Sequence, residues 1–163
     1  MIESLEVIKW FVDESHNTNW DYKGHAGAMM VMGCGAISSY SRRIKVNTRS
    51  STETELVLID AYMPEVLWYI YFIQAQGYGV KYAEIHQDNV SEQIMETNGK
   101  FSSSRKTKHI KDKFLFIKDK VNSGEVKIVD CPEGVMWADI LTKPLQGTEF
   151  RKMRAQLMNC AME

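Results

Sequence analysis

The chain has 163 residues, of which 44% are hydrophobic and 25% charged, with a formal net charge of −1. This size and composition predict one globular domain with a sizeable core. We identify no uninterrupted apolar run long enough to span a bilayer and no signal-peptide pattern at the N-terminus, so a membrane or secreted protein is not expected. Cys34, Cys131 and Cys160 form neither a zinc pattern nor a disulfide framework, which favours a reducing compartment.

The N-terminal half predicts strands followed by a long helix. The expected strands are residues 5–13, 25–32 and 36–45. Apolar residues then recur at helical spacing, which predicts a helix over residues 53–75. Pro64 interrupts this stripe, so we expect a kink or a restart of the helix there.

The C-terminal half alternates between strand and helix patterns. Strands are expected at 80–87 and 125–130, helices at 89–98, 110–121, 134–142 and 150–158, and a basic loop at 99–107. The predicted order is βββαβααβαα. Such an order indicates an α/β fold in which an antiparallel meander joins parallel crossovers in one mixed sheet.

Four acidic residues stand at positions suited to metal binding, namely Asp13, Glu55, Asp88 and Asp139. Carboxylates at strand ends and helix starts are held rigidly, and Mg²⁺ prefers such oxygen ligands. Two divalent ions held in this way suggest phosphodiester chemistry. Each residue taken alone also has an ordinary explanation as a helix cap or a solvated side chain.

Two neighbours compete with these acidic residues. Glu14 follows Asp13, but side chains alternate along a strand, so the two point to opposite faces. Ser50 and Glu53 fit a capping box, which gives Glu53 a structural role. We therefore assign Glu55 to the site and Glu53 to the helix cap.

Basic residues are clustered although the net charge is close to zero. One cluster lies between Arg42 and Arg49, and another between Lys100 and Lys113. Local patches of this kind attract polyanions, although a solvated helix face explains the second cluster equally well. For Trp20, Trp68 and Trp137, packing in a core or interface is favoured over stacking on nucleic acid.

Several blocks of the sequence carry a family resemblance. They are Ser50-Ser51-Thr52-Glu53-Thr54-Glu55, Gln87-Asp88-Asn89, Thr107-Lys108-His109-Ile110 and Ala138-Asp139-Ile140-Leu141-Thr142-Lys143-Pro144-Leu145. In this order and spacing they resemble the ribonuclease H region of copia-type long-terminal-repeat retrotransposon polyproteins. The start of that region is similar to Asp13 and the residues up to Gly27.

The resemblance implies a fold and an activity. The fold is ribonuclease H-like, with a five-stranded mixed sheet flanked by helices. We assign residues 1–145 to this domain and 146–163 to a C-terminal amphipathic helix that packs on it or on a neighbouring domain. The implied reaction is hydrolysis of the RNA strand of an RNA–DNA hybrid with two Mg²⁺ ions, or Mn²⁺, held by Asp13, Glu55, Asp88 and Asp139.

The resemblance also implies partners and a location. The substrate contacts would be Asn89, Arg105, Lys106, Lys108 and His109. An adjacent reverse transcriptase domain is the expected protein partner, no membrane partner is expected, and the location is cytoplasmic, in virus-like particles, or else nuclear. No histidine lies in residues 132–137, so a histidine proton shuttle is not expected there. The alternatives are a catalytically silent module and another nuclease of the same fold.

Overall fold

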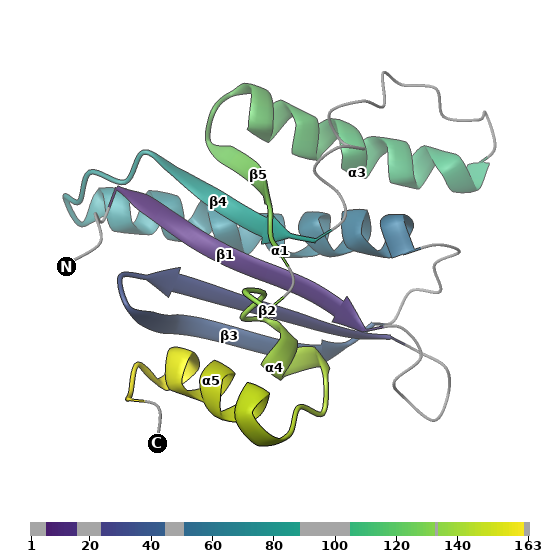
Figure 1. The fold of residues 1–163 in the computed structure, drawn as a ribbon. Coiled ribbons are helices and arrows are strands. Elements are labelled where there is room, and N and C mark those ends of the chain that lie inside the picture. Colours follow the sequence, from purple (N-terminus) through teal and green to yellow (C-terminus); the bar gives the residue numbers. More distant parts are fainter. Residues whose placement is uncertain (1–5, 16–23, 45–50, 89–104, 133, 162–163) are drawn as a thin grey trace.

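The computed structural model describes residues 6–15, 24–44, 51–88, 105–132 and 134–161, with backbone only for 51–53 and 105–110. In chain order the elements are β1 (Val7–Ser15), β2 (His25–Met32), β3 (Gly35–Arg43), α1 (Ser51–Ala75), β4 (Tyr82–Gln87), α3 (Arg105–Asn122), β5 (Val126–Asp130), α4 (Asp139–Thr142) and α5 (Gly147–Met158) (Figure 1).

The strands of the described residues form one five-stranded sheet in the order β3-β2-β1-β4-β5. Strand β1 is central: it pairs with β2 in antiparallel fashion and with β4 in parallel fashion, and β4 pairs with β5 in parallel fashion. The structure therefore confirms the α/β class and the mixed sheet that the sequence predicted.

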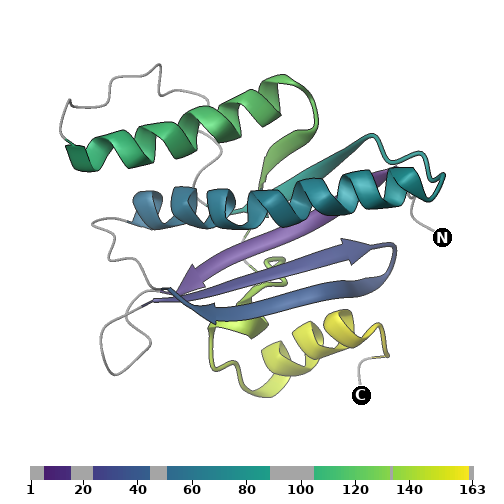
Figure 2. The same cartoon turned by 180° about the vertical axis from the view of Figure 1, so that it is seen from behind.

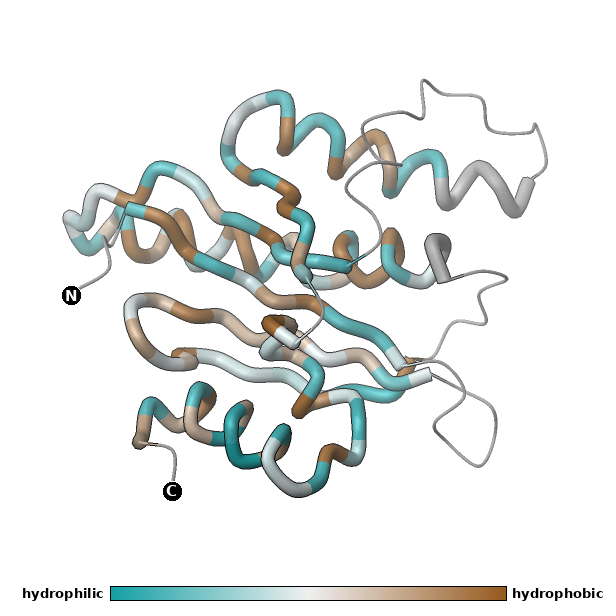
Figure 3. The backbone as a smooth tube through the Cα atoms, in the orientation of Figure 1, coloured by the Kyte–Doolittle hydropathy of each residue, from teal (hydrophilic) through white to brown (hydrophobic). Residues whose placement is uncertain are grey.

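Helices cover both faces of the sheet (Figures 1 and 2). Because side chains alternate along β1, Trp10 and Val12 enter the larger core with α1 and α3, whereas Phe11 enters a smaller core under α4 and α5. Figure 3 shows hydrophobic and hydrophilic segments alternating along α3. This helix buries Phe114 and Ile117, while Leu115 and Phe116 stay exposed.

Helix α1 corrects one sequence expectation, the restart at Pro64. It runs unbroken through Pro64, so no restart occurs, because Met63 and Val66 on either side are buried in the core. Thr54–Ala75 is also long and apolar enough to cross a membrane by length and composition alone. Half of its most apolar window is buried inside this fold, which accounts for that composition.

Two other segments differ from the prediction, and a third cannot be compared. Residues 105–107, expected in a loop, begin α3. The helix expected at 134–142 is confined to α4, because Gly134 adopts a φ of +80° and the chain turns before Asp139. The predicted helix at 89–98 and the loop residues 99–104 lie outside the described residues.

Helix α5 packs against the domain's own sheet. Met153 is buried, Leu157 contacts the smaller core, and the Lys152 ammonium donates to the Gly134 carbonyl at 2.9 Å. At Gly35 on β3, a Cβ would lie 2.7 Å from the Cβ of Asn159, so the strand and the end of the helix are closely packed. The division of the chain at residue 145 stays a prediction.

Candidate functional site

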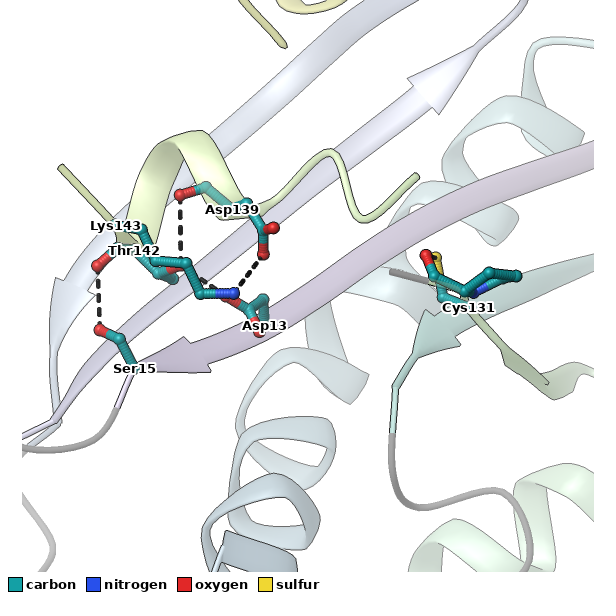
Figure 4. A network of polar contacts seen from close by, with 7 residues as sticks. Asp13, Ser15, Cys131, Asp139, Thr142 and Lys143 are labelled. Atoms are coloured by element: carbon teal, nitrogen blue, oxygen red, sulfur yellow. Dashed lines mark hydrogen bonds and ion pairs between the residues drawn. The ribbon is translucent and has the colours of Figure 1, made fainter. Parts of the chain in front are cut away.

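Asp13 and Asp139, the first and last of the predicted metal ligands, meet at one site (Figure 4). The Thr142 hydroxyl donates a 2.5 Å hydrogen bond to Oδ2 of Asp13. The Lys143 Nζ lies 2.7 Å from Asp139 Oδ1 and 3.5 Å from Asp13 Oδ2. Strand β1 and helix α4 thus bring together residues that are far apart in the sequence.

The position of α4 over the sheet is set by Gly27 and two serines. Gly27 pairs with Asp13 across β1 and β2, and a Cβ there would lie 2.7 Å from Thr142 Cγ2 and 3.0 Å from the Ala138 oxygen. The Ser15 and Ser41 hydroxyls donate to the carbonyls of Thr142 at 2.9 Å and Leu141 at 2.7 Å. Helix ends leave such carbonyls unpaired, so these bonds fix the end of α4.

The environment of Asp13 disfavours its charge. The residue is 3% exposed, and burial raises the pKa of its carboxyl group from 3.8 to about 6. The Thr142 hydrogen bond and the Lys143 charge lower this pKa, while the Asp139 carboxylate raises it. A cation next to Asp13 therefore has a direct energetic role, because it compensates for lost hydration and for repulsion from Asp139.

Lys143 supplies such a cation. Burial disfavours its charge, but the hydrogen bond to Asp139 and the charge of Asp13 outweigh burial, so the pKa of Lys143 is raised. The two carboxylates thus already stabilise one cation between them. Their hard oxygen atoms, and a position that favours positive charge, fit the requirements of a Mg²⁺ or Mn²⁺ ion.

Asp88 lies at the same edge of the sheet. It follows the last residue of β4, and the pairing of Phe11 with His86 places it level with Asp13 on the neighbouring parallel strand. The thiol of Cys131 lies near these carboxylates. Burial raises the pKa of Cys131 to about 11, and nearby negative charges contribute to the rise. These charges belong to Asp130, Asp88, Asp139 and Asp13. Asp88 thus lies at the same end of the sheet as Asp13, and the charges of both residues and of Asp139 act on Cys131.

Glu55 is buried near the start of α1, with 2% exposure. Across the described part of the chain, no group of three or more Asp, Glu, His or Cys residues is close enough to hold one metal ion. The structure therefore brings Asp13 and Asp139 together and places Asp88 nearby. It does not bring Glu55 into a common ligand group with them.

The predicted substrate contacts are only partly described. The backbone of Arg105, Lys106, Lys108 and His109 lies in α3, while their side chains, as well as Asn89, lie outside the described residues. At the C-terminal end of the basic cluster between Lys100 and Lys113, one residue has a partner within the fold. Lys113 forms an ion pair with Asp60 of α1, because α3 packs on that helix.

The capping-box residues, Ser50 and the Glu53 side chain, lie outside the described residues, as does Trp20. The other two tryptophans differ in their surroundings. Trp137 stacks on Phe11 in the smaller core, with ring centres 4.6 Å apart, as the packing interpretation predicted. Trp68 is half exposed and stacks on Phe72 at 4.8 Å on the outer face of α1.

Five residues that shape this site had no role assigned from the sequence, namely Ser15, Gly27, Ser41, Thr142 and Lys143. All of them except Ser41 stand within the family blocks. The signal for Lys143 was its position four residues after Asp139, since side chains at this spacing are neighbours on a helix. No sequence pattern indicated that α4 would pack directly on Gly27.

We compared the chain with known proteins, and no family model matches it. The retrovirus-related Pol polyprotein from transposon RE1 of Arabidopsis thaliana is 30% identical over 138 residues, which is 84% of this chain and 9% of that polyprotein. The corresponding polyprotein from transposon TNT 1-94 of Nicotiana tabacum is 27% identical over 145 residues, or 88% of this chain and 11% of its own length. The chain thus spans about a tenth of these relatives.

Solved structures with the same fold share little sequence. RNase H1 from Halobacterium salinarum matches with a TM-score of 0.55 and 15% identity, covering 83% of this chain and 94% of that one. LC11-RNase H1 in complex with an RNA/DNA hybrid matches at 0.55 and 16%, covering 83% and 93%. Foamy viral protease-reverse transcriptase in complex with an RNA/DNA hybrid matches at 0.52 and 17%, covering 86% and 20%.

These likenesses and the strand order place the chain in the ribonuclease H fold class. Within that class, it is a homologue of one segment of the retrovirus-related Pol polyproteins of copia-type transposons, as the sequence blocks predicted.

Proposed function

We propose that this chain is a metal-dependent ribonuclease H that cleaves the RNA strand of RNA–DNA hybrids during reverse transcription of a retrotransposon. The observation that carries the proposal is the meeting of Asp13 and Asp139 around one cation position, with Asp88 at the adjacent strand end. Similarity to ribonucleases H and to Pol polyproteins supports the same reaction.

Asp13, Asp139, Asp88 and Glu55 would hold the metal, which is Mg²⁺ or, alternatively, Mn²⁺. When bound, such ions activate water and neutralise charge that develops on a phosphate. The chain itself contributes the rigid placement of the carboxylates. Asp13 is fixed by the Thr142 hydroxyl, and Asp139 lies on a helix that two serines and a close glycine contact hold on the sheet.

The substrate would contact the basic N-terminal end of α3, where Arg105, Lys106, Lys108 and His109 are the proposed phosphate contacts, together with Asn89. Contacts of this kind make binding salt-dependent. We expect the affinity for a hybrid to fall steeply as salt is raised, and Lys106→Ala with Lys108→Ala to reduce the slope of that dependence. Fluorescence anisotropy with a labelled hybrid measures it, and Lys127→Ala on β5 provides the control.

The direct test uses a hybrid with a labelled RNA strand and Mg²⁺, beside duplex RNA and duplex DNA of the same sequence. Cleavage of the hybrid alone, lost in Asp88→Asn with folding unchanged, is the expected result. Cleavage of duplex DNA instead would favour another nuclease of this fold.

A catalytically silent module is the second candidate, and one observation favours it: Glu55 does not share a ligand group with Asp13 and Asp139 in this structure. A silent module would bind the hybrid without cleaving it, with or without Mg²⁺. The same assay separates the two, because binding without cleavage at any Mg²⁺ or Mn²⁺ concentration would support the silent module.

The protein partner we propose is the adjacent reverse transcriptase domain of the same polyprotein. An apolar surface supports this, since Ile37, Trp68, Phe72 and Tyr78 are each about half exposed at the end of α1 and on β3. A groove of about 370 Å³ lies beside Phe72 and Tyr78. Exposed apolar patches of this kind are typical of interaction sites.

The position of the first described residue supports this partner. The backbone N–H of Lys81 donates to the Glu6 carbonyl at 2.8 Å, so the first described residue lies near Tyr78. Glu6 and the apolar surface thus lie at the same end of β1 and β4. We also propose that the protein acts in cytoplasmic virus-like particles, with the nucleus as the alternative.

Binding of the separately expressed upstream segment tests this surface. Trp68→Ser combined with Phe72→Ser should abolish the complex in sedimentation experiments, because it removes the stacked pair. Leu115→Ser, which removes an equally exposed apolar side chain on α3, should leave the complex intact. Equal binding by all three proteins would exclude the apolar surface as the contact.

A further inference from the structure

Lys143 is the first residue after helix α4, and its side chain extends back over the end of the helix toward Asp139. Its backbone N–H donates to the Asp139 carbonyl at 2.8 Å, and its φ of −121° and ψ of 143° are extended. The side chain then brings Nζ to 2.7 Å from Asp139 Oδ1. The same Nζ lies 3.5 Å from Asp13 Oδ2, so one ammonium group contacts carboxylates from two elements (Figure 4).

The two ends of this contact differ in their access to water. Asp13 is 3% exposed, whereas the Lys143 side chain is 40% exposed. The carboxylate is therefore fixed inside the fold, and the flexible lysine side chain reaches it from the surface. A lysine can swing back into water through rotation of its own side chain, without a change in the backbone.

We propose that Lys143 is a tethered placeholder cation: its ammonium occupies the charge position between Asp13 and Asp139 until a divalent metal displaces it. The proposal rests on the proposed metal role of these two carboxylates. Before metal binding, the ammonium offsets the repulsion between two acidic groups that the fold holds together. Since one position cannot hold both cations, the placeholder lowers the apparent affinity for the metal.

The contacts of the described residues indicate that Lys143 competes with a metal ion and is not needed to hold the carboxylates in place. Thr142 already fixes Asp13 through its hydroxyl, and Ser15 and Ser41 already fix the end of α4. The Asp13 carboxylate and the backbone of α4 therefore keep their places when Lys143 leaves. A lysine that served only to orient Asp139 would not need to approach Asp13.

Metal titration in the absence of substrate tests the proposal. Lys143→Met keeps the length of the side chain and removes its charge, while Lys81→Met removes an exposed ion pair with Glu6 and serves as the control. Isothermal titration calorimetry with Mn²⁺ should show about tenfold tighter binding to Lys143→Met, because a nearly buried carboxylate is screened little by water. The melting temperature without metal should fall, and its rise with Mn²⁺ should exceed that of the wild type.

A measurement on the unaltered protein covers the case in which Lys143→Met does not fold. The rate at which acetic anhydride modifies Lys143, followed by mass spectrometry, should rise severalfold when Mg²⁺ is added. The rate for Lys81 should not change.

The outcomes separate the inference from the proposed function. Wild-type metal binding with equal or weaker affinity in Lys143→Met, or unchanged labelling of Lys143, overturns the placeholder role and leaves the nuclease proposal intact. An absence of Mg²⁺ and Mn²⁺ binding in the wild type, even at millimolar concentrations, overturns both.

Discussion

Gly27 pairs directly with Asp13 across β1 and β2, and it is the absence of a side chain at Gly27 that lets α4 approach the acidic residue. With a Cβ at this position, contacts of 2.7 Å to Thr142 Cγ2 and 2.9 Å to Leu141 Cβ would force the helix away. The geometry of the site thus depends on a residue that has no functional group.

Gly27→Ala should therefore damage both folding and activity. Overpacking of this kind costs about 1–3 kcal/mol of unfolding free energy, and displacement of α4 would separate Asp139 from Asp13. Chemical denaturation and the hybrid cleavage assay measure the two effects. Gly79→Ala is the matched control, since nothing lies within 4 Å of a Cβ there. Equal effects of the two substitutions would contradict the packing argument.

Asp13→Asn should stabilise the metal-free protein while it abolishes cleavage. Because the folded-state pKa of Asp13 is raised from 3.8 to about 6, its contribution to stability is greatest below pH 4 and is lost as the pH rises to 6 and above. An asparagine avoids this loss, which corresponds to roughly 3 kcal/mol at pH 8. Urea denaturation at a series of pH values in EDTA measures it.

The control for this experiment is Asp112→Asn, which replaces an exposed carboxylate on α3 and should change stability little. The advantage of Asp13→Asn should disappear near pH 4, where the aspartic acid is neutral. A destabilised Asp13→Asn at pH 8 would show that the carboxylate is better compensated than its burial indicates.

The hydroxyl of Thr142 should affect metal-dependent cleavage through its hydrogen bond to Asp13. Thr142→Val removes the hydrogen bond that lowers the pKa of Asp13, so this pKa should rise further. We expect a higher Mg²⁺ requirement, with a larger defect at pH 6.5 than at pH 8. The Mg²⁺ dependence of cleavage at the two pH values is the measurement, and a pH-independent defect would indicate a packing effect instead. Thr142→Ser, which keeps the hydroxyl, should remain close to the wild type.

Neutral substitutions distinguish the proposed roles of Glu55 in the site and Glu53 in the helix cap. Glu55 is almost fully buried at the start of α1, and we expect Glu55→Gln to reduce cleavage by about a hundredfold or more, as loss of a charge-stabilising group does. Glu53→Gln should affect only helix stability, by about 1 kcal/mol. Circular dichroism and the cleavage assay separate the two, and the reverse pattern would move the site to Glu53.

Periodicity and local patterns predicted most of the fold and the acidic residues. The alternation along β1 and the helical stripe of α1 identify buried faces, and the four acidic residues stood at element boundaries. Contacts between distant segments could not be predicted from the sequence, because they arise from the packing of whole elements. Examples are the contacts of Lys143 with Asp13, Gly27 with Thr142 and Lys113 with Asp60. The continuity of α1 through Pro64 has the same origin, since burial on both sides outweighs the local preference.

The most direct test of ribonuclease H activity at this site is the hybrid cleavage assay. It compares the wild type with Asp139→Asn after both proteins have been shown to be equally folded. We expect Mg²⁺-dependent cleavage of the RNA strand by the wild type, with 5′-phosphate products, and none by Asp139→Asn. Equal cleavage by the two proteins, or a folded wild type that does not cleave the hybrid with either Mg²⁺ or Mn²⁺, would contradict this expectation.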